Sequence, residues 1–83
     1  MKLSIRYFAS IREALGQSLE SVDTSATTLG GLRDELIARG GAYAQALARG
    51  KAVRMALNQV MVEESAALGE GAEVAFFPPV TGG

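Results

Sequence analysis

The residues with the clearest chemical potential lie at the C-terminal end of the chain, which reads Pro78-Pro79-Val80-Thr81-Gly82-Gly83. Two prolines favour a polyproline II backbone and donate no hydrogen bonds to a sheet, so this segment is expected to project from the domain. Because glycine has no Cβ, a terminal Gly82-Gly83 can enter a channel too narrow for bulkier residues. The pattern predicts an extended segment with a reactive carboxylate at Gly83. An ordinary frayed terminus without a function is the alternative interpretation of the same residues.

The rest of the chain lacks the side chains of most catalytic and metal centres. It contains no His and no Cys, which excludes disulfides, cysteine-based zinc sites, thiolate nucleophiles and histidine bases. The carboxylate pairs Glu63-Glu64 and Glu70/Glu73 lack the spacing of a known metal-binding loop. We therefore expect no bound metal or cofactor, and a self-contained enzyme is the least expected class.

Length and charge restrict the class of protein and of partner. The 83 residues suffice for a single domain, and 8 cationic against 9 acidic side chains give a net charge of -1. That balance does not provide the basic footprint of a nucleic-acid-binding protein. No apolar run approaches the ~20 residues of a membrane span, and the N-terminus does not resemble a signal peptide. These features predict a cytoplasmic protein without a membrane or nucleic-acid partner.

The first part of the chain predicts strand, short helix and strand. Residues 2–8 alternate, with Leu3, Ile5 and Tyr7 on one face, as in a half-buried strand. Ser10 and Glu13 have the spacing of a capping box, and Gly16 is placed to end a short helix. Residues 18–22 alternate more weakly and predict a second strand with Leu19 or Val22 facing inward.

The middle of the chain predicts the main helix. Thr27 or Thr28 can cap it, and Gly40-Gly41 can end it. The expected inner face consists of Leu29, Leu32, Leu36 and Ile37, and the expected solvent face consists of Arg33, Asp34, Glu35 and Arg39. Gly30 and Gly31 disfavour the first turn unless another segment packs closely there. Residues 42–48 predict a further short helix.

The last part predicts a hairpin and a final strand. Residues 54–57 and 60–62 flank Asn58-Gln59, a tight-turn signal. Residues 73–77 alternate, with Val74 and Phe76 on one face, and Pro78-Pro79 ends the strand. The element order predicts an α+β roll with a mixed sheet of about five strands crossed by one main helix plus short helices. We expect a domain over residues 1–77 and an extended, flexible tail over residues 78–83.

The C-terminal run EVAFFPPVTGG, residues 73–83, resembles the signature of the small subunit of molybdopterin synthase, a ubiquitin-like β-grasp sulfur carrier. The run RYFASIRE, residues 6–13, is similar to the opening strand and short helix of that family. The run ALNQ, residues 56–59, is similar to its hairpin.

The resemblance implies a chemical role for the tail. A ubiquitin-activating-like adenylyltransferase would join the Gly83 carboxylate to AMP from ATP, and a persulfide sulfur donor, a desulfurase or rhodanese, would convert the adenylate to a thiocarboxylate. Val80, Thr81 and Gly82 would then enter a channel in the large synthase subunit. There Gly83 would give sulfur to a cyclic pyranopterin phosphate, forming the dithiolene of the molybdenum cofactor. The chain would be non-catalytic alone and part of a heterotetramer.

Several residues are candidates for docking to that partner. Phe77 faces away from Phe76 and is expected to be an exposed aromatic anchor beside Pro78 and Pro79. Met61 is expected to point outward if its neighbouring valines point inward. Arg12 could pair with an acidic partner, although a solvated helix charge is the plainer interpretation.

Three other interpretations remain open from the sequence. One is a thiamine-pathway sulfur carrier, and another is a protein modifier whose Gly83 forms an isopeptide bond with a lysine. The third is an interaction module with an irrelevant tail, which predicts that deletion of Gly82-Gly83 changes no activity.

Overall fold

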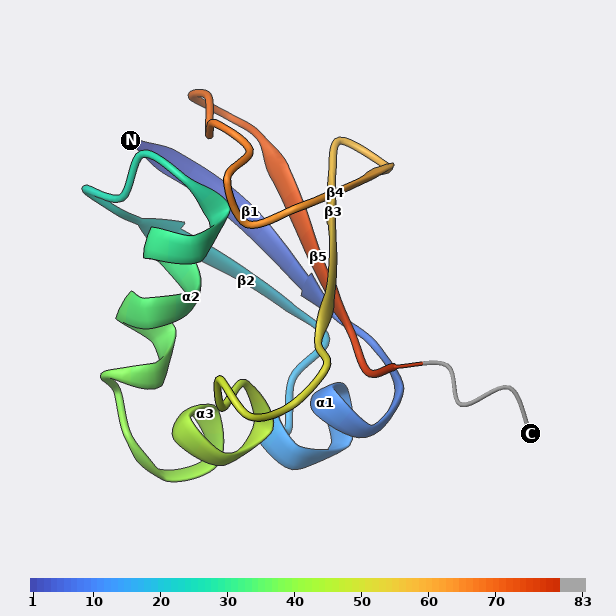
Figure 1. Cartoon of the computed structure of the whole chain (residues 1–83). Helices are drawn as coiled ribbons and strands as arrows, with labels where there is room; N and C mark the ends of the chain where they lie inside the picture. Colours follow the sequence, from blue (N-terminus) through green and yellow to red (C-terminus); the bar gives the residue numbers. More distant parts are fainter. Residues whose placement is uncertain (80–83) are drawn as a thin grey trace.

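The computed structural model describes residues 1–79, which form one mixed sheet and three helices (Figure 1). The elements are β1 (Lys2–Tyr7), α1 (Ala9–Leu15), β2 (Leu19–Asp23), α2 (Leu29–Ile37), α3 (Gly41–Ala46), β3 (Arg54–Leu57), β4 (Val60–Val62) and β5 (Glu73–Phe77). The strand order is β2-β1-β5-β3-β4. Strands β1 and β5 are parallel, and the other pairs are antiparallel. The predicted mixed sheet of about five strands with one main helix is confirmed.

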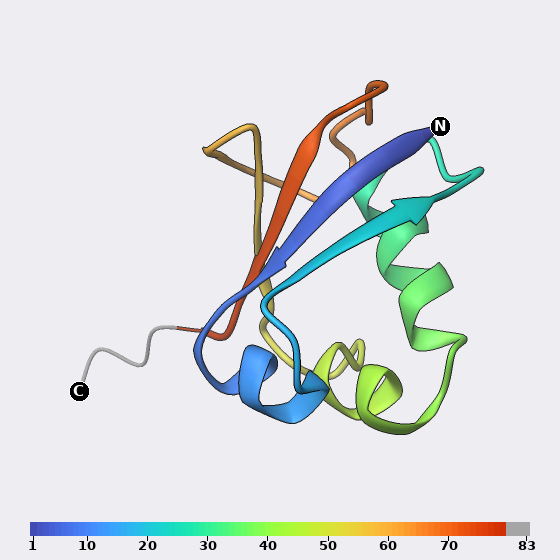
Figure 2. The same ribbon diagram turned by 180° about the vertical axis from the view of Figure 1, so that it is seen from behind.

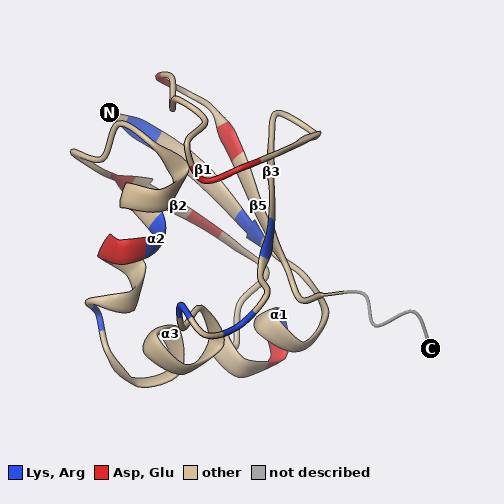
Figure 3. Cartoon of the chain, viewed as in Figure 1, with Lys and Arg blue, Asp and Glu red and all other residues tan. Residues whose placement is uncertain are grey.

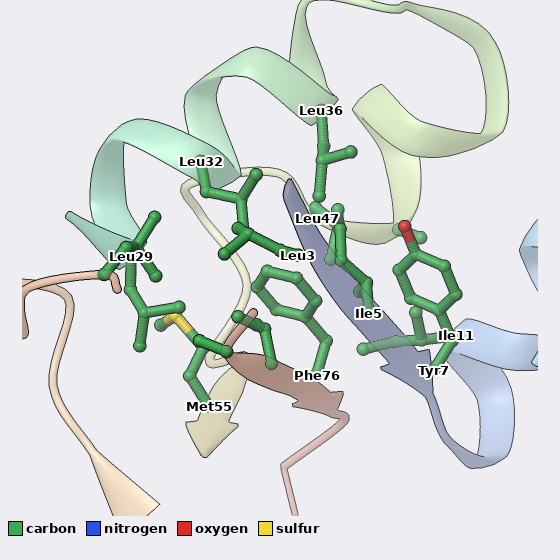
Figure 4. Close-up of a cluster of buried hydrophobic side chains, with 14 residues drawn as sticks. Leu3, Ile5, Tyr7, Ile11, Leu29, Leu32, Leu36, Leu47, Met55 and Phe76 are labelled. Carbon is green, nitrogen blue, oxygen red and sulfur yellow. The ribbon is translucent and has the colours of Figure 1, made fainter. Parts of the chain in front are cut away.

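The core lies between one face of the sheet and the helices, and the other face carries no helix (Figures 1 and 2). The alternation of β1 and β5 buries the residues predicted from the sequence, and α2 contributes its leucines from the opposite side. Figure 4 shows this cluster, which includes Leu3, Ile5, Tyr7, Leu29, Leu32, Leu36, Leu47, Met55 and Phe76. In β2, Val22 packs against the core whereas Leu19 is 54% exposed.

The hairpin and the start of the main helix follow the predicted local chemistry. Asn58 and Gln59 both have positive φ, 50° and 69°, as a two-residue hairpin turn requires. The Thr28 side chain caps α2 by accepting from the Gly31 amide. Close packing also accounts for Gly30, because a Cβ there would lie 3.3 Å from the Glu64 Cβ.

The predicted capping box at Ser10 is wrong. Helix α1 begins at Ala9, and Phe8 occupies the N-cap position without a side-chain cap. The Phe8 carbonyl accepts from the amides of Ile11 and Arg12, while the Phe8 amide donates to Phe76 on β5. The helix starts two residues earlier because strand pairing fixes Phe8, and Ser10 falls inside the first turn. Gly16 ends the helix in a left-handed conformation, as predicted.

The predicted solvent exposure of Arg33 is also wrong, since this side chain is only 3% exposed. Its Nε donates to the Leu47 carbonyl at 2.8 Å, and its Nη2 donates to the carbonyls of Ala48 at 2.7 Å and Lys51 at 3.1 Å. Burial lowers the pKa of Arg33, and the Glu64 carboxylate opposes that shift. The guanidinium is buried because the chain after α3 turns three backbone carbonyls toward α2, and these carbonyls accept its hydrogen bonds.

None of the helices within residues 1–79 is long and apolar enough to cross a membrane. The same residues contain no group of three side chains arranged to hold a metal ion.

Candidate functional site

The tail root, residues 77–79, leaves the domain from the central strand of the sheet. Strand β5 lies between β1 and β3, and its Phe76 is fully buried and stacks on Tyr7 with ring centroids 6.1 Å apart. The strand ends at Phe77 because Pro78 and Pro79 cannot donate to a neighbouring strand. A segment attached here is held at its base by the most buried part of the molecule.

The residues predicted to carry the chemistry, Val80, Thr81, Gly82 and Gly83, lie outside the described residues. Their assignment therefore stays a prediction. The described part of the site consists of the tail root and the surfaces next to it.

Phe77 lies on the helix-free face of the sheet and is half-buried rather than fully exposed. Its ring stacks on that of Phe8, with centroids 4.7 Å apart and an interplanar angle of 11°. The parallel pairing of β1 and β5 causes this contact, because Tyr7 is opposite Phe76 and the next residue of each strand turns to the other face. Phe77 is thus part of an aromatic pair at the base of the tail.

A partly apolar row of side chains crosses the helix-free face. The strand register aligns Leu19, Arg6, Ala75, Ala56 and Met61, one from each strand. We call these residues, together with Phe8 and Phe77, the open face. An open groove of about 470 Å³ runs over it, lined by Arg6, Phe8, Ala56, Gln59, Met61, Glu73, Ala75 and Phe77.

Met61 is 55% exposed on the open face, in register with Ala56. Both flanking valines lie on the face of β4 opposite Met61, as expected, but only Val62 packs against the core. Val60 is 61% exposed because β4 is an edge strand at the side of the sheet. An exposed methionine and an aromatic pair are common features of protein-binding surfaces.

Arg12 lies on α1, close to the tail root but not on the open face. Its side chain is exposed and forms no ion pair within residues 1–79. A small groove of about 160 Å³ borders another face of α1, and Arg12 does not line it. Its lining residues are Ser10, Ile11, Ala14, Ala46, Lys51, Val53, Pro78 and Pro79. This groove brings α1, the chain after α3 and the tail root together.

A hydrogen-bonded network around Glu20 lies on the helix-covered side of the sheet. Glu20 accepts from the hydroxyls of Tyr7 and Tyr43 and from Arg39, at 2.8, 3.2 and 2.7 Å. Burial alone would raise the pKa of Glu20, but these hydrogen bonds outweigh burial and lower it. Burial and the hydrogen bond to Glu20 raise the pKa of Tyr7. This network holds the sheet and the helices together, whereas the open face carries the exposed side chains suited to binding a partner.

The sequence analysis did not single out several residues of the open face. Phe8, Arg6, Ala56 and Ala75 carry no individual signal, and Leu19 is only a candidate for the core. The alternation in residues 2–8 does place Arg6 and Phe8 opposite the core residues. Only the strand order reveals that these positions align across five strands.

The chain is similar to known proteins over nearly its whole length. A model of the ThiS family matches residues 5–83. The molybdopterin synthase sulfur carrier subunit of Escherichia coli K12 is 40% identical over 81 residues, covering 98% of this chain and 99% of that protein. The protein of the same name from Haemophilus influenzae is 37% identical, with the same coverage.

Solved structures show the same fold. The crystal structure of SAMP1 from Haloferax volcanii, a small archaeal modifier protein, superposes with a TM-score of 0.78 and is 26% identical, with full coverage of both chains. A complex of subunits 1 and 2 of the molybdopterin-converting factor from Helicobacter pylori gives a TM-score of 0.70 at 24% identity, again with full coverage. The predicted ubiquitin-like β-grasp fold is confirmed by these matches. The chain therefore belongs to the ThiS family, with the β-grasp fold of its sulfur carriers.

Proposed function

We propose that this chain is the sulfur carrier subunit of a molybdopterin synthase and that Gly83 carries the sulfur as a thiocarboxylate. The observation that supports this most strongly is the full-length similarity to curated relatives of one name. Three molybdopterin synthase sulfur carrier subunits are 36% to 40% identical over at least 98% of this chain.

The proposed chemistry begins with activation, because a carboxylate is a poor acylating agent. An adenylyltransferase joins Gly83 to AMP from ATP and releases pyrophosphate. The terminal sulfur of a donor persulfide displaces AMP, and a thiol then cleaves the resulting acyl disulfide to leave the thiocarboxylate. Because a thiocarboxylate is ionised at neutral pH and polarisable, it needs no neighbouring base to act as a nucleophile. This suits a chain without His or Cys.

The proposed delivery uses the geometry of the tail root. The open face, with Phe77 and Met61, docks on the large subunit, and Pro78 and Pro79 direct the tail into its channel. Val80, Thr81 and Gly82 enter that channel, and the large subunit supplies the acid, the base and the ligands for the pterin phosphate. The complex of subunits 1 and 2 from Helicobacter pylori supports a two-subunit assembly of this kind.

Intact mass of the protein purified from cells tests the proposal. A fraction of the chain is expected to show one oxygen replaced by sulfur. A variant extended by one alanine after Gly83 is expected to keep its circular dichroism spectrum but to gain no sulfur and to support no dithiolene formation. In the extended variant the carboxyl group of Gly83 is part of a peptide bond and cannot be adenylated, so full sulfur transfer by this variant would contradict the proposal.

A protein modifier is the second candidate, favoured by the similarity to SAMP1 from Haloferax volcanii. In that case Gly83 would form an isopeptide bond with a lysine of another protein. Immunoblots of cell extracts would then show a ladder of higher-mass species that disappears when Gly82-Gly83 is deleted. A single band together with the sulfur-bearing mass favours the carrier.

A further inference from the structure

Two cationic side chains, Lys51 and Arg54, lie beside the tail root, and a third, Arg12, lies on the neighbouring helix α1 without lining the groove at the tail root. Arg54 is the first residue of β3 and lies in register with Phe77. Lys51 lines the small groove that Pro78 and Pro79 also line. Arg12 lies on α1, whose residues Ile11 and Ala14 line the same groove. We call Arg12, Lys51 and Arg54 the tail-root cations, and Figure 3 shows blue segments in β3 and in the loop before it.

The tail-root cations differ from the other arginines in lacking carboxylate partners. The ion pairs of those arginines are Arg6–Glu73, Arg33–Glu64, Arg39–Glu20, Arg49–Asp34 and Arg49–Glu64. Within residues 1–79, no carboxylate lies within ion-pair distance of Arg12, Lys51 or Arg54.

The local charge at the tail root is positive although the chain as a whole carries a net charge of -1. Arg54 shares an open groove with Glu63 and Glu64, and Glu13 follows Arg12 on α1. Glu64 pairs with two other arginines. Glu63 and Glu13 are exposed and form no ion pair within the described residues, so they offset the three cations only in part.

We propose, building on the proposed function, that the tail-root cations guide docking by recognising an acidic rim around the entrance of the partner's channel. Arg54 is continuous with the open face through Phe77, and Lys51 lines the same groove as Pro78 and Pro79, from which the tail would enter the channel. A carboxylate-rich surface at that entrance would meet them as the tail is inserted. The ligand is a protein surface that carries negative charge.

The length of the tail argues against a nucleotide or pterin phosphate as the ligand. In the extended form that the proposed function requires, the four residues after Pro79 span about 13 Å. Gly83 and any phosphate bound beside it would therefore lie beyond the reach of side chains at the tail root. The rim of the channel, not its end, is within their reach.

The expected effect is on the rate of association. Exposed ion pairs add little to affinity, but complementary surface charge speeds diffusional encounter and loses this effect as salt rises. A charge placed beside the entering segment favours encounters in which the tail already points into the channel.

The chain offers a matched pair of variants, because Lys2 and Lys51 are its only lysines. Both are exposed, and neither forms an ion pair within residues 1–79. Lys2 begins β1, about 20 Å along the strand from Phe8 and the tail root. Lys51→Gln and Lys2→Gln therefore remove the same charge at opposite ends of the sheet.

Stopped-flow binding of the full chain to its large subunit, at about 0.01 M and 0.15 M salt, measures the effect. We expect Lys51→Gln to slow association about twofold to threefold at the lower salt, and Lys51→Gln/Arg54→Gln about fivefold to tenfold. The dissociation rate should change little, the difference should shrink at the higher salt, and Lys2→Gln should bind like the unmodified chain.

Equal association rates for all variants would overturn the proposal that the tail-root cations guide docking. An equal slowing by Lys2→Gln would also overturn it. A separate comparison distinguishes this failure from failure of the proposed function. If the unmodified chain binds the large subunit and transfers sulfur while the charge variants behave identically, only the proposed role of the tail-root cations is wrong. If the unmodified chain neither binds nor gains sulfur, the proposed function is wrong as well.

Discussion

At the scale of single residues, the stacked pair of Phe8 and Phe77 is the most informative feature of the surface. Each ring restrains the other, so Phe77 is held in place before any partner arrives. An ordered side chain loses less conformational entropy on binding than a free one. This favours Phe77 as the anchor of the open face, although it is half-buried instead of fully exposed.

We expect Phe77→Ala to weaken binding to the large subunit by about 1–3 kcal/mol, because it removes an aromatic anchor beside the tail. Titration calorimetry with the full chain measures the dissociation constant. Val60→Ala is the control, because Val60 is an exposed apolar residue that lies on the face of β4 opposite Met61 and therefore outside the open face. A dissociation constant unchanged by Phe77→Ala would remove this residue from the interface.

At the scale of elements, local sequence signals were reliable where one segment decides the outcome. The Thr28 cap, the left-handed Gly16 and the Asn58-Gln59 turn follow from side-chain chemistry within a few residues. The Ser10 cap failed because pairing with β5 fixed the start of α1, and the exposure of Arg33 failed because carbonyls after α3 bind it. Contacts between distant segments override local preference in both cases.

The Glu20 network links four elements through one carboxylate. Glu20 on β2 binds Tyr7 of β1, Arg39 after α2 and Tyr43 of α3. The Arg39 guanidinium also lies 4.8 Å from the centre of the Tyr43 ring. The network fastens the two helices to the edge of the sheet, which suits a role in stability.

The pKa of Glu20 gives this network a predictable pH dependence. Because the folded pKa lies below the unfolded value of about 4.3, the carboxylate stabilises the fold above that pH, and the effect disappears as pH falls through the folded pKa. Glu20→Gln should therefore lower the free energy of unfolding by about 2 kcal/mol at pH 7.

Urea unfolding of both proteins at several pH values measures this difference, which should shrink as the pH approaches the folded pKa. Glu13→Gln is the control, because Glu13 is exposed and forms no ion pair within the described residues. A destabilisation by Glu20→Gln that stayed constant down to the folded pKa would show that the charge of Glu20 contributes nothing.

At the scale of the whole molecule, the strand order places the tail root at the centre of the sheet. Strand β5 is last in the chain but lies between β1 and β3, so the N-terminal strand and the hairpin support the base of the tail. The open face, the tail root and the tail-root cations therefore belong to one domain. A partner can contact the open face, the tail root and the tail-root cations in a single docking event.

The proposed division into a domain over residues 1–77 and a tail predicts that truncation after Pro79 leaves folding intact. The free energy of unfolding should change by less than about 0.5 kcal/mol, because the core and the last strand end at Phe77. Urea unfolding checks the stability, and intact mass after incubation with the activating enzyme, ATP and a sulfur donor should show no thiocarboxylate. A clear loss of stability would assign residues 80–83 a part in the fold.

The sequence by itself determined the elements and their inward faces, the lack of conventional catalytic side chains and the candidate chemistry of the chain end. These properties follow from the types and spacing of neighbouring residues. Only the tertiary structure decided that Phe8 stacks on Phe77, that Arg33 is buried and that Lys51 and Arg54 lie beside the tail root. Each of these contacts joins segments far apart in the chain, so it depends on strand order and register, which local patterns do not specify.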